Sequence, residues 1–180
     1  MKKIIYVLSL LLISQLTGCI VFHSVSYEVN VNEDGTGTAL VTIEDLNTDA
    51  TTKEMIDEDV KSILEYGLKS TEFVDGMNAE GKKIVSRNLF VEKEKLNALI
   101  SYEFNEISKV EGMQFEDPYY YLTIPPEDSI ISTNGQITRT NEYKRIVWDE
   151  SIKTLKFKMY SDDTSRDGLT SLAPYFLKEN

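Results

Sequence analysis

The sequence contains one histidine, His23, among its 180 residues. Nucleophilic triads and most metal enzymes need histidine as a base or a ligand, and neither a Gly-x-Ser-x-Gly sequence nor a Walker loop is found. The thirty acidic residues leave a carboxylate-dependent hydrolase as a less favoured alternative, because no pair of them stands out from the rest. We therefore predict a protein that is not an enzyme and that needs no cofactor.

Long apolar runs are also scarce, since the only one is Ile4–Ile13 near the N-terminus. Lys2 and Lys3 precede this run, and the small residues Thr17 and Gly18 lie between it and Cys19, the only cysteine. This order of positive charge, apolar run and small residues is typical of a secretory signal rather than of a folded element. The rest of the chain is therefore predicted to lie outside the cytoplasm.

The stretch Leu-Thr-Gly-Cys, residues 16–19, resembles the lipobox of bacterial lipoproteins, Leu-x-Gly-Cys. The resemblance implies a diacylglycerol thioether on Cys19, cleavage before it, and often acylation, as by palmitate, of the freed amine. Each buried methylene contributes roughly 0.8 kcal/mol, so two or more acyl chains form a stable anchor. We expect residues 1–18 to be a signal peptide and residues 19–180 to be a single extracytoplasmic domain, anchored in the cell membrane or the outer membrane.

Two other interpretations of Cys19 remain. In the first, the apolar segment is an uncleaved signal anchor, because it is nearly long enough to cross a bilayer. In the second, Cys19 is a free thiol in a secreted protein, which is unusual in an oxidising compartment. We prefer lipidation, because it accounts for the position of the cysteine, for its neighbours and for the presence of only one cysteine in the chain.

The chain is strongly acidic, with a formal net charge of −11. Cleavage before Cys19 would remove two lysines and no acids, which changes the net charge to −13. Such a domain is repelled by nucleic acid and by anionic headgroups, so nucleic acid is not an expected partner. The lipid anchor is the expected link to the membrane, and an apolar lipid or an envelope protein is the expected partner.

Hydrophobic patterning after the signal predicts an α+β fold with a mostly antiparallel, curled sheet and one principal helix. Apolar residues alternate from His23 to Val31, and Asp34-Gly35 then predicts a hairpin to a strand over 38–44. A helix is predicted over 51–70, with Thr51 and Glu54 as a capping box. Its expected buried face consists of Ile56, Val60, Ile63, Leu64 and Leu68.

The rest of the chain is predicted to form mainly strands. Phe73-Val74 is predicted as a short strand, and the residues 92–97 between two longer strands as one helical turn or a loop. Asn134-Gly135 predicts a hairpin turn, and Arg145–Asp149 with Thr154–Tyr160 a second hairpin.

These motifs resemble the LppM-like domain of bacterial envelope lipoproteins over roughly Tyr27 to Tyr160. The resemblance rests on four features: a first hairpin VNVNEDGTG, one helix, the segment IPPEDSIISTNGQ that begins near two prolines, and the strand RIVWD. The resemblance implies a curled sheet packed with a helix, around an apolar cavity able to hold lipid. The expected function is binding of an apolar ligand or a partner protein near the membrane. A structural or assembly role through an exposed sheet edge is the alternative.

If a cavity lies between helix and sheet, six large apolar residues are its expected lining, and the alternative is a filled core. The six are Ile56, Ile63, Phe90, Phe104, Leu122 and Trp148.

A metal site is not predicted. The spacing of Asp163, Ser165 and Asp167 before Gly168 resembles the first half of a calcium loop, but Pro174 occupies the position where a bidentate glutamate is required. This weak calcium candidate is better explained as a polar turn.

The lipobox gives the first testable prediction. Changing Cys19→Ser should release the domain from the membrane fraction or leave an uncleaved precursor, because the serine hydroxyl cannot form the thioether. Cell fractionation followed by intact-mass measurement checks this, and a mutant processed and membrane-bound like the wild type would contradict it.

Overall fold

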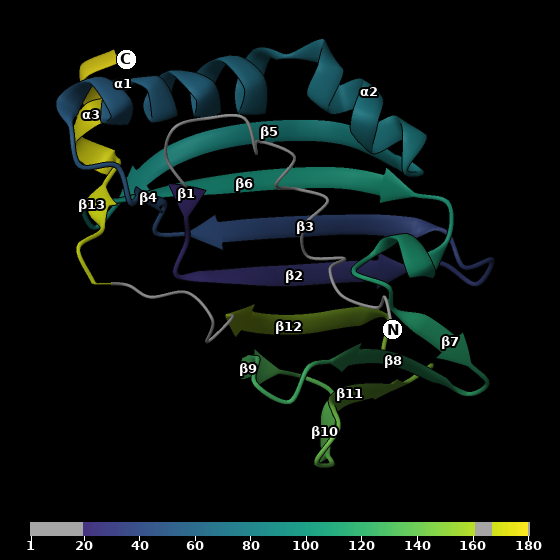
Figure 1. Cartoon of the computed structure of the whole chain (residues 1–180). Coiled ribbons are helices and arrows are strands. Elements are labelled where there is room, and N and C mark those ends of the chain that lie inside the picture. Colours follow the sequence, from purple (N-terminus) through teal and green to yellow (C-terminus); the bar gives the residue numbers. More distant parts are fainter. Residues whose placement is uncertain (1–19, 161–166, 180) are drawn as a thin grey trace.

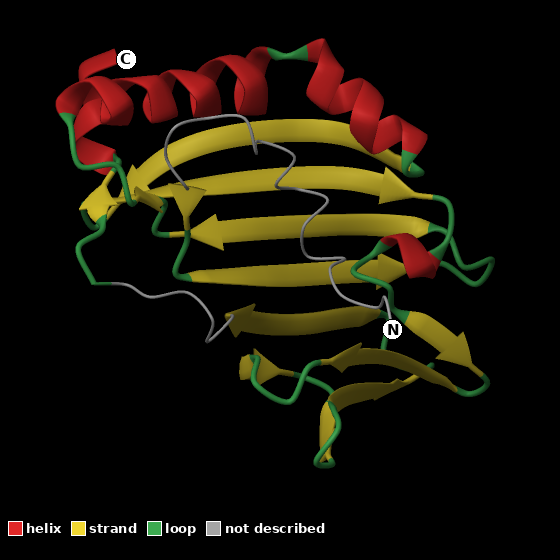
Figure 2. Ribbon diagram, in the orientation of Figure 1, coloured by secondary structure: helices red, strands yellow, loops and turns green. Residues whose placement is uncertain are grey.

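The computed structural model describes residues 20–160 and 167–179 and shows an α+β fold built on antiparallel sheets, as predicted (Figures 1 and 2). The largest sheet has six strands in the order β5-β6-β3-β2-β12-β9. In chain order these strands are β2 (Ser24–Val31), β3 (Gly37–Glu44), β5 (Lys82–Glu92), β6 (Lys95–Phe104), β9 (Ser129–Thr133) and β12 (Thr154–Tyr160).

Two smaller antiparallel sheets complete the strand content. A four-stranded sheet has the order β10-β11-β8-β7, with β7 (Gln114–Glu116), β8 (Tyr119–Ile124), β10 (Gln136–Arg139) and β11 (Lys144–Asp149). A three-stranded sheet joins β1 (Ile20–Val21), β4 (Asn47–Thr48) and β13 (Thr170–Ser171). A short 3₁₀ turn, η3 (Ile107–Lys109), precedes β7.

The first predicted hairpin is confirmed. β2 pairs with β3 over its whole length, and its inward residues Val25, Tyr27, Val29 and Val31 are buried. Gly35 has a φ of +81°, a conformation that glycine adopts without steric cost. Alternation along β2 therefore directs one apolar row toward the core.

The predicted principal helix is present but is less regular than expected. It comprises α1 (Lys53–Ser62) and the π-helical segment η2 (Ile63–Lys69), and a second helix, α2 (Thr71–Ala79), follows. The cap is Thr52, whose hydroxyl accepts from the Met55 amide, and not the predicted Thr51. Leu64 is only partly buried, because a π turn holds more residues than an α turn and rotates the following side chains off the predicted face.

The prediction of a strand at Phe73-Val74 is wrong, since both residues lie in α2. The hydroxyl of Ser70 accepts from the Glu72 and Phe73 amides and so caps this helix. Phe73 and Met77, four residues apart, are buried on one face of the helix, and this packing outweighs the strand propensity of a short apolar pair. A third helix, α3 (Ala173–Glu179), lies beside α1 in Figure 1.

A two-residue turn joins β5 to β6, where the sequence predicts a longer loop. Lys93 and Glu94 both have positive φ, 50° and 64°, as in the mirror-image turns that match the twist of a hairpin. Neither residue type favours this conformation, so the turn is held by the ten-residue pairing of the two strands rather than by its own chemistry.

The predicted hairpin of Arg145–Asp149 with Thr154–Tyr160 is wrong, because β11 pairs with β10 and β8 whereas β12 pairs with β2 and β9. The prediction that Asn134-Gly135 closes a hairpin is also wrong. β9, before this pair, joins β12 in the six-stranded sheet, whereas β10, after it, joins β11 in the four-stranded sheet. The Asn134 side-chain oxygen accepts from the Trp148 indole N–H and from the Lys156 amide, each at 2.8 Å. The pair is therefore the joint at which the chain crosses from one sheet to the other.

Among the described residues, the buried apolar core extends from Val25 to Ala173. Trp148 connects the two larger sheets, because its ring lies 5.8 Å from that of Phe157, which stacks on Tyr27 at 4.7 Å. We therefore regard residues 20–180 as a folding unit. Within the described ranges, no helix is both long enough and apolar enough to cross a membrane.

The sheet joint generates a stability prediction. A methyl group on Gly135 would lie 2.7 Å from both the Trp148 indole nitrogen and the Ile146 Cγ2 atom, which is too close for a van der Waals contact. Gly135→Ala should lower the free energy of unfolding by about 1–3 kcal/mol, as overpacking does in other cores. Urea unfolding of residues 20–180 measures this.

Gly76→Ala is the matched control, because Gly76 is an exposed residue of α2 with open space around its α-carbon. Alanine is the better helix former by up to about 1 kcal/mol, so this variant should be as stable as the wild type or more stable. Equal stability of the two variants would contradict the described packing at the joint.

Candidate functional site

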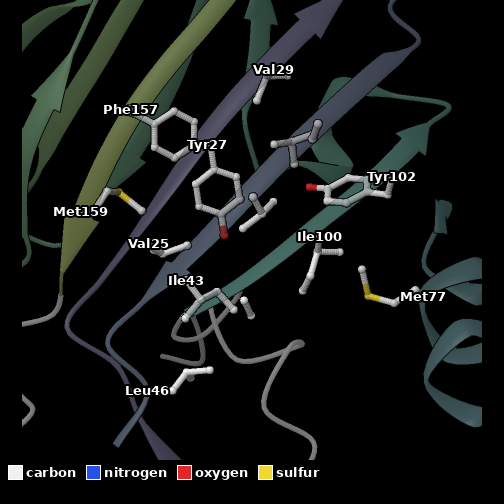
Figure 3. Packing of buried hydrophobic residues seen from close by; sticks show 14 of the residues in the cluster. Val25, Tyr27, Val29, Ile43, Leu46, Met77, Ile100, Tyr102, Phe157 and Met159 are labelled. Carbon is white, nitrogen blue, oxygen red and sulfur yellow. The ribbon is translucent and has the colours of Figure 1, made fainter. Parts of the chain in front are cut away.

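The strongest candidate site is an apolar cavity of about 120 Å³ between the six-stranded sheet and the helices η2 and α2. Its floor is the inner face of β5, β6, β3 and β2, on which buried side chains gather in Figure 3. Its lining is almost entirely apolar or aromatic, which is typical of sites for apolar ligands.

The floor follows from strand register. Leu89 of β5 lies opposite Ala98, and Ala98 is followed across the sheet by Ile43 and Val25. Directly paired residues point to the same face of a sheet, so these four side chains form one row across four strands. With strands about 4.8 Å apart, the row is about 14 Å long.

The roof consists of Ile63, Tyr66 and Leu68 from the π-helical segment and Phe73 from α2. Tyr66 and Phe73 meet edge to face, with ring centroids 5.9 Å apart. π turns inside helices are frequent at functional sites, because they change the direction in which side chains project. Here the turn directs Tyr66 toward the cavity.

One wall of the cavity includes Ile20 and Phe22, the first residues of the described chain. β1, which begins at Ile20, pairs with β4, and the His23 amide donates to the Glu44 carbonyl. The residues that directly follow Cys19 are therefore held against the cavity. Cys19 itself lies outside the described residues.

The six residues expected to line one cavity are not brought together, and this expectation needs correction. Ile63 lines the cavity, whereas the other five do not. Phe90 points to the opposite face of β5, since it is the neighbour of the inward Leu89, and 36% of its surface is exposed.

The other four residues are buried elsewhere in the fold. Ile56 lies in the core under α1, and Phe104 packs against the backbone of Gly37, where glycine leaves room for its ring. Leu122 and Trp148 belong to β8 and β11 of the four-stranded sheet, at the other side of the inner face. The sequence does not show that the strands divide into two sheets, so it could not separate these residues.

Asp163 and Ser165 of the calcium-like string lie outside the described residues, and Asp167 is an exposed turn residue. In the ranges that the structure describes, no group of three or more carboxylate, histidine or cysteine side chains is placed to hold a metal ion.

Arg87 is the charged residue of the cavity lining, and little in the sequence indicates its role. Its Nη1 atom donates to the carbonyls of Gly67 and Ser70, at 2.9 and 3.2 Å, near the end of the π-helical segment. Its guanidinium lies 5.4 Å from the centre of the Phe73 ring. Burial lowers the pKa of Arg87, because the surroundings disfavour its charge. The only signal in the sequence is one arginine within an apolar strand.

Glu111 places a carboxyl group beside the floor residue Tyr27, whose hydroxyl donates to Glu111 Oε1 at 2.8 Å. The other oxygen, Oε2, is buried without a hydrogen-bond partner among the described residues, although the residue as a whole is partly exposed. Burial raises the pKa of Glu111, while the hydrogen bond from Tyr27 and the charge of Lys82 oppose this rise. Burial also raises the pKa values of Tyr27 and Tyr102.

A second cleft, of about 570 Å³, lies between the turn after β2 and the turn after β11. Two of its carboxylates form hydrogen bonds within the turns: Asp34 accepts from Thr36, and Asp149 accepts from the Ser151 amide. These bonds lower the pKa of both carboxyls. The cleft is thus a surface between well-formed turns, and we prefer the apolar cavity as the site.

The chain has no significant match to a protein-family model, to a curated protein or to a solved structure.

Glu111 generates a pH prediction. Between the ordinary pKa near 4.5 and the higher pKa of the folded state, the folded protein keeps a proton that the unfolded chain releases. The contribution of Glu111 to stability should therefore fall as the pH rises through this window. Glu111→Gln keeps an acceptor for Tyr27 and removes the titration, so its stability relative to the wild type should increase from about pH 4 to about pH 8. Urea unfolding at both pH values measures this, and a difference independent of pH would contradict it.

Proposed function

We propose that the protein is a membrane-anchored bacterial envelope lipoprotein whose non-catalytic domain binds an apolar ligand near the membrane. The observation that carries the proposal is the apolar cavity whose wall includes Ile20 and Phe22. If Cys19 bears the lipid, the anchor and the cavity are separated by a single peptide bond. A ligand leaving the bilayer would then have a short path to the site. The resemblance to LppM-like domains supports the same proposal.

The size of the cavity restricts the ligand. Sites for drug-sized molecules usually hold about 300–1,000 Å³, whereas an engineered apolar cavity of about 150 Å³ in another protein binds benzene. A cavity of about 120 Å³ therefore suits a short apolar segment rather than a whole membrane lipid.

An assembly role through a sheet edge is the second candidate, in which the partner is an envelope protein. β5 is the edge strand, has eleven residues and exposes 61% of Val85 and 36% of Phe90. A partner strand pairing there would satisfy the free backbone groups of that edge. However, Lys83 and a register shift between Ile84 and Ser86 interrupt the edge, and such features commonly prevent edge pairing.

Uptake of a fluorescent probe that carries a short acyl chain, matched to the size of the cavity, by delipidated residues 20–180 tests the proposal. The wild type should bind the probe saturably, and Leu89→Trp, which fills the cavity floor, should weaken binding by about tenfold or more. Phe90→Trp is the matched control, because this neighbouring residue points to the opposite face of the same strand.

Equal binding by the two variants would show that the probe does not occupy the cavity. Absence of saturable uptake by the folded wild type would favour the assembly role at the β5 edge instead.

A further inference from the structure

We propose that the cavity takes an apolar monocarboxylic acid, with Arg87 as the partner of its carboxylate. This inference rests on the proposed binding function and specifies the chemistry of the ligand. It identifies a polar determinant in a site that is otherwise apolar.

The position of Arg87 is the first argument. Arg87 lies in β5, two residues before Leu89, and its cross-strand neighbour is Ile100 of β6. Both neighbours line the cavity, so Arg87 stands at the β5 end of the floor, whose opposite end is formed by Val25 and Tyr27 of β2. A ligand whose carboxylate meets Arg87 would extend its apolar part across the strands, over Leu89, Ala98 and Ile43.

The unused donors of Arg87 are the second argument. A guanidinium has five N–H groups in a fork that fits a carboxylate. The structure assigns only Nη1 to protein acceptors, the carbonyls of Gly67 and Ser70. Nε and Nη2 have no acceptor among the described residues. These two carbonyls also fix the guanidinium, so the remaining donors are oriented before any ligand arrives.

Charge complementarity is the third argument. The chain carries thirty acidic residues, and seven lysines form ion pairs with some of them. Arg87, in contrast, pairs with no carboxylate of the described chain, and its nearest described ring is that of Phe73. A partly buried cation without a counter-ion is costly, and a bound anion would offset this cost. The negative net charge of the domain opposes anion binding in general, so binding of an acid in this cavity would depend on this local cation.

The available volume indicates the length of the apolar part. By comparison with the benzene-sized cavity, about 120 Å³ accommodates roughly five or six carbon atoms. Octanoate has seven carbon atoms beyond its carboxylate, so its chain would fill this volume and leave about one or two carbons and the carboxylate at the rim. Longer acids would have to extend beyond the cavity toward Ile20 and Phe22, which line its wall.

Calorimetric titration of residues 20–180 with octanoate and with 1-octanol tests this assignment at neutral pH. The two probes have equal chain length and differ in the charged head. The wild type should bind octanoate about tenfold tighter than 1-octanol, because charge-assisted hydrogen bonds are formed only with the acid. Arg87→Gln should weaken octanoate binding by about tenfold and leave 1-octanol binding nearly unchanged, and Arg87→Lys should restore part of the loss.

Each outcome separates the two proposals. Equal affinity of the wild type for both probes would overturn the role of Arg87 but leave the cavity as an apolar site. Failure of both probes to bind folded wild-type protein would overturn the cavity function together with this inference. Thermal unfolding verifies that the variants fold. If Arg87→Gln does not fold, the comparison of the two probes on the wild type decides the question alone.

Discussion

The inner face of the six-stranded sheet is the constraint on which the rest of the structure depends. It is apolar across all of its central strands, so it must be covered, and no single layer of this fold covers it. The helices pack over β5 and β6, while the four-stranded sheet reaches β12 through the contact of Trp148 with Phe157. The cavity lies beneath the helical layer, where η2 and α2 cover β5, β6, β3 and β2. It is thus a gap under one of the two layers that share this wide face.

The buried polar side chains under these layers differ in how many of their hydrogen-bonding atoms have a partner. Asn134 meets the Trp148 indole, the Lys156 amide and the Thr154 carbonyl, so the joint between the sheets is fully bonded. Asp59, buried in α1, accepts from the hydroxyl of Thr48 and thereby ties the helix to β4, yet its Oδ1 atom has no partner among the described residues. Buried groups that are only partly bonded destabilise a fold. Asp59 and Glu111 are thus two points at which stability is lost, and the carboxyl group of Glu111 is bonded to Tyr27, which lines the cavity.

Local chemistry determined how much of the fold could be predicted from the sequence. The β2–β3 hairpin was predictable because alternation and Asp34-Gly35 agree. Lys93-Glu94 was not, because its turn is imposed by the flanking strands, and Asn134-Gly135 was misassigned because its strands pair in different sheets. Ile63 was correctly placed at the cavity since it belongs to a helix face. Arg87 was missed because its surroundings come from Gly67, Phe73 and Ile100, which only the folded chain brings together.

The acidity of the domain and its proposed anchor act in opposite directions. A net negative domain is repelled by an anionic membrane surface, but screening confines this repulsion to about 8 Å at physiological ionic strength. Little free chain separates Cys19 from the folded domain, since Ile20 already pairs with Thr48 of β4. An anchor at Cys19 would therefore hold the wall formed by Ile20 and Phe22 near the bilayer, and repulsion would turn the acidic outer surfaces away from it. Under this arrangement the two forces orient the domain together, with the apolar cavity on the side from which an apolar acid would arrive.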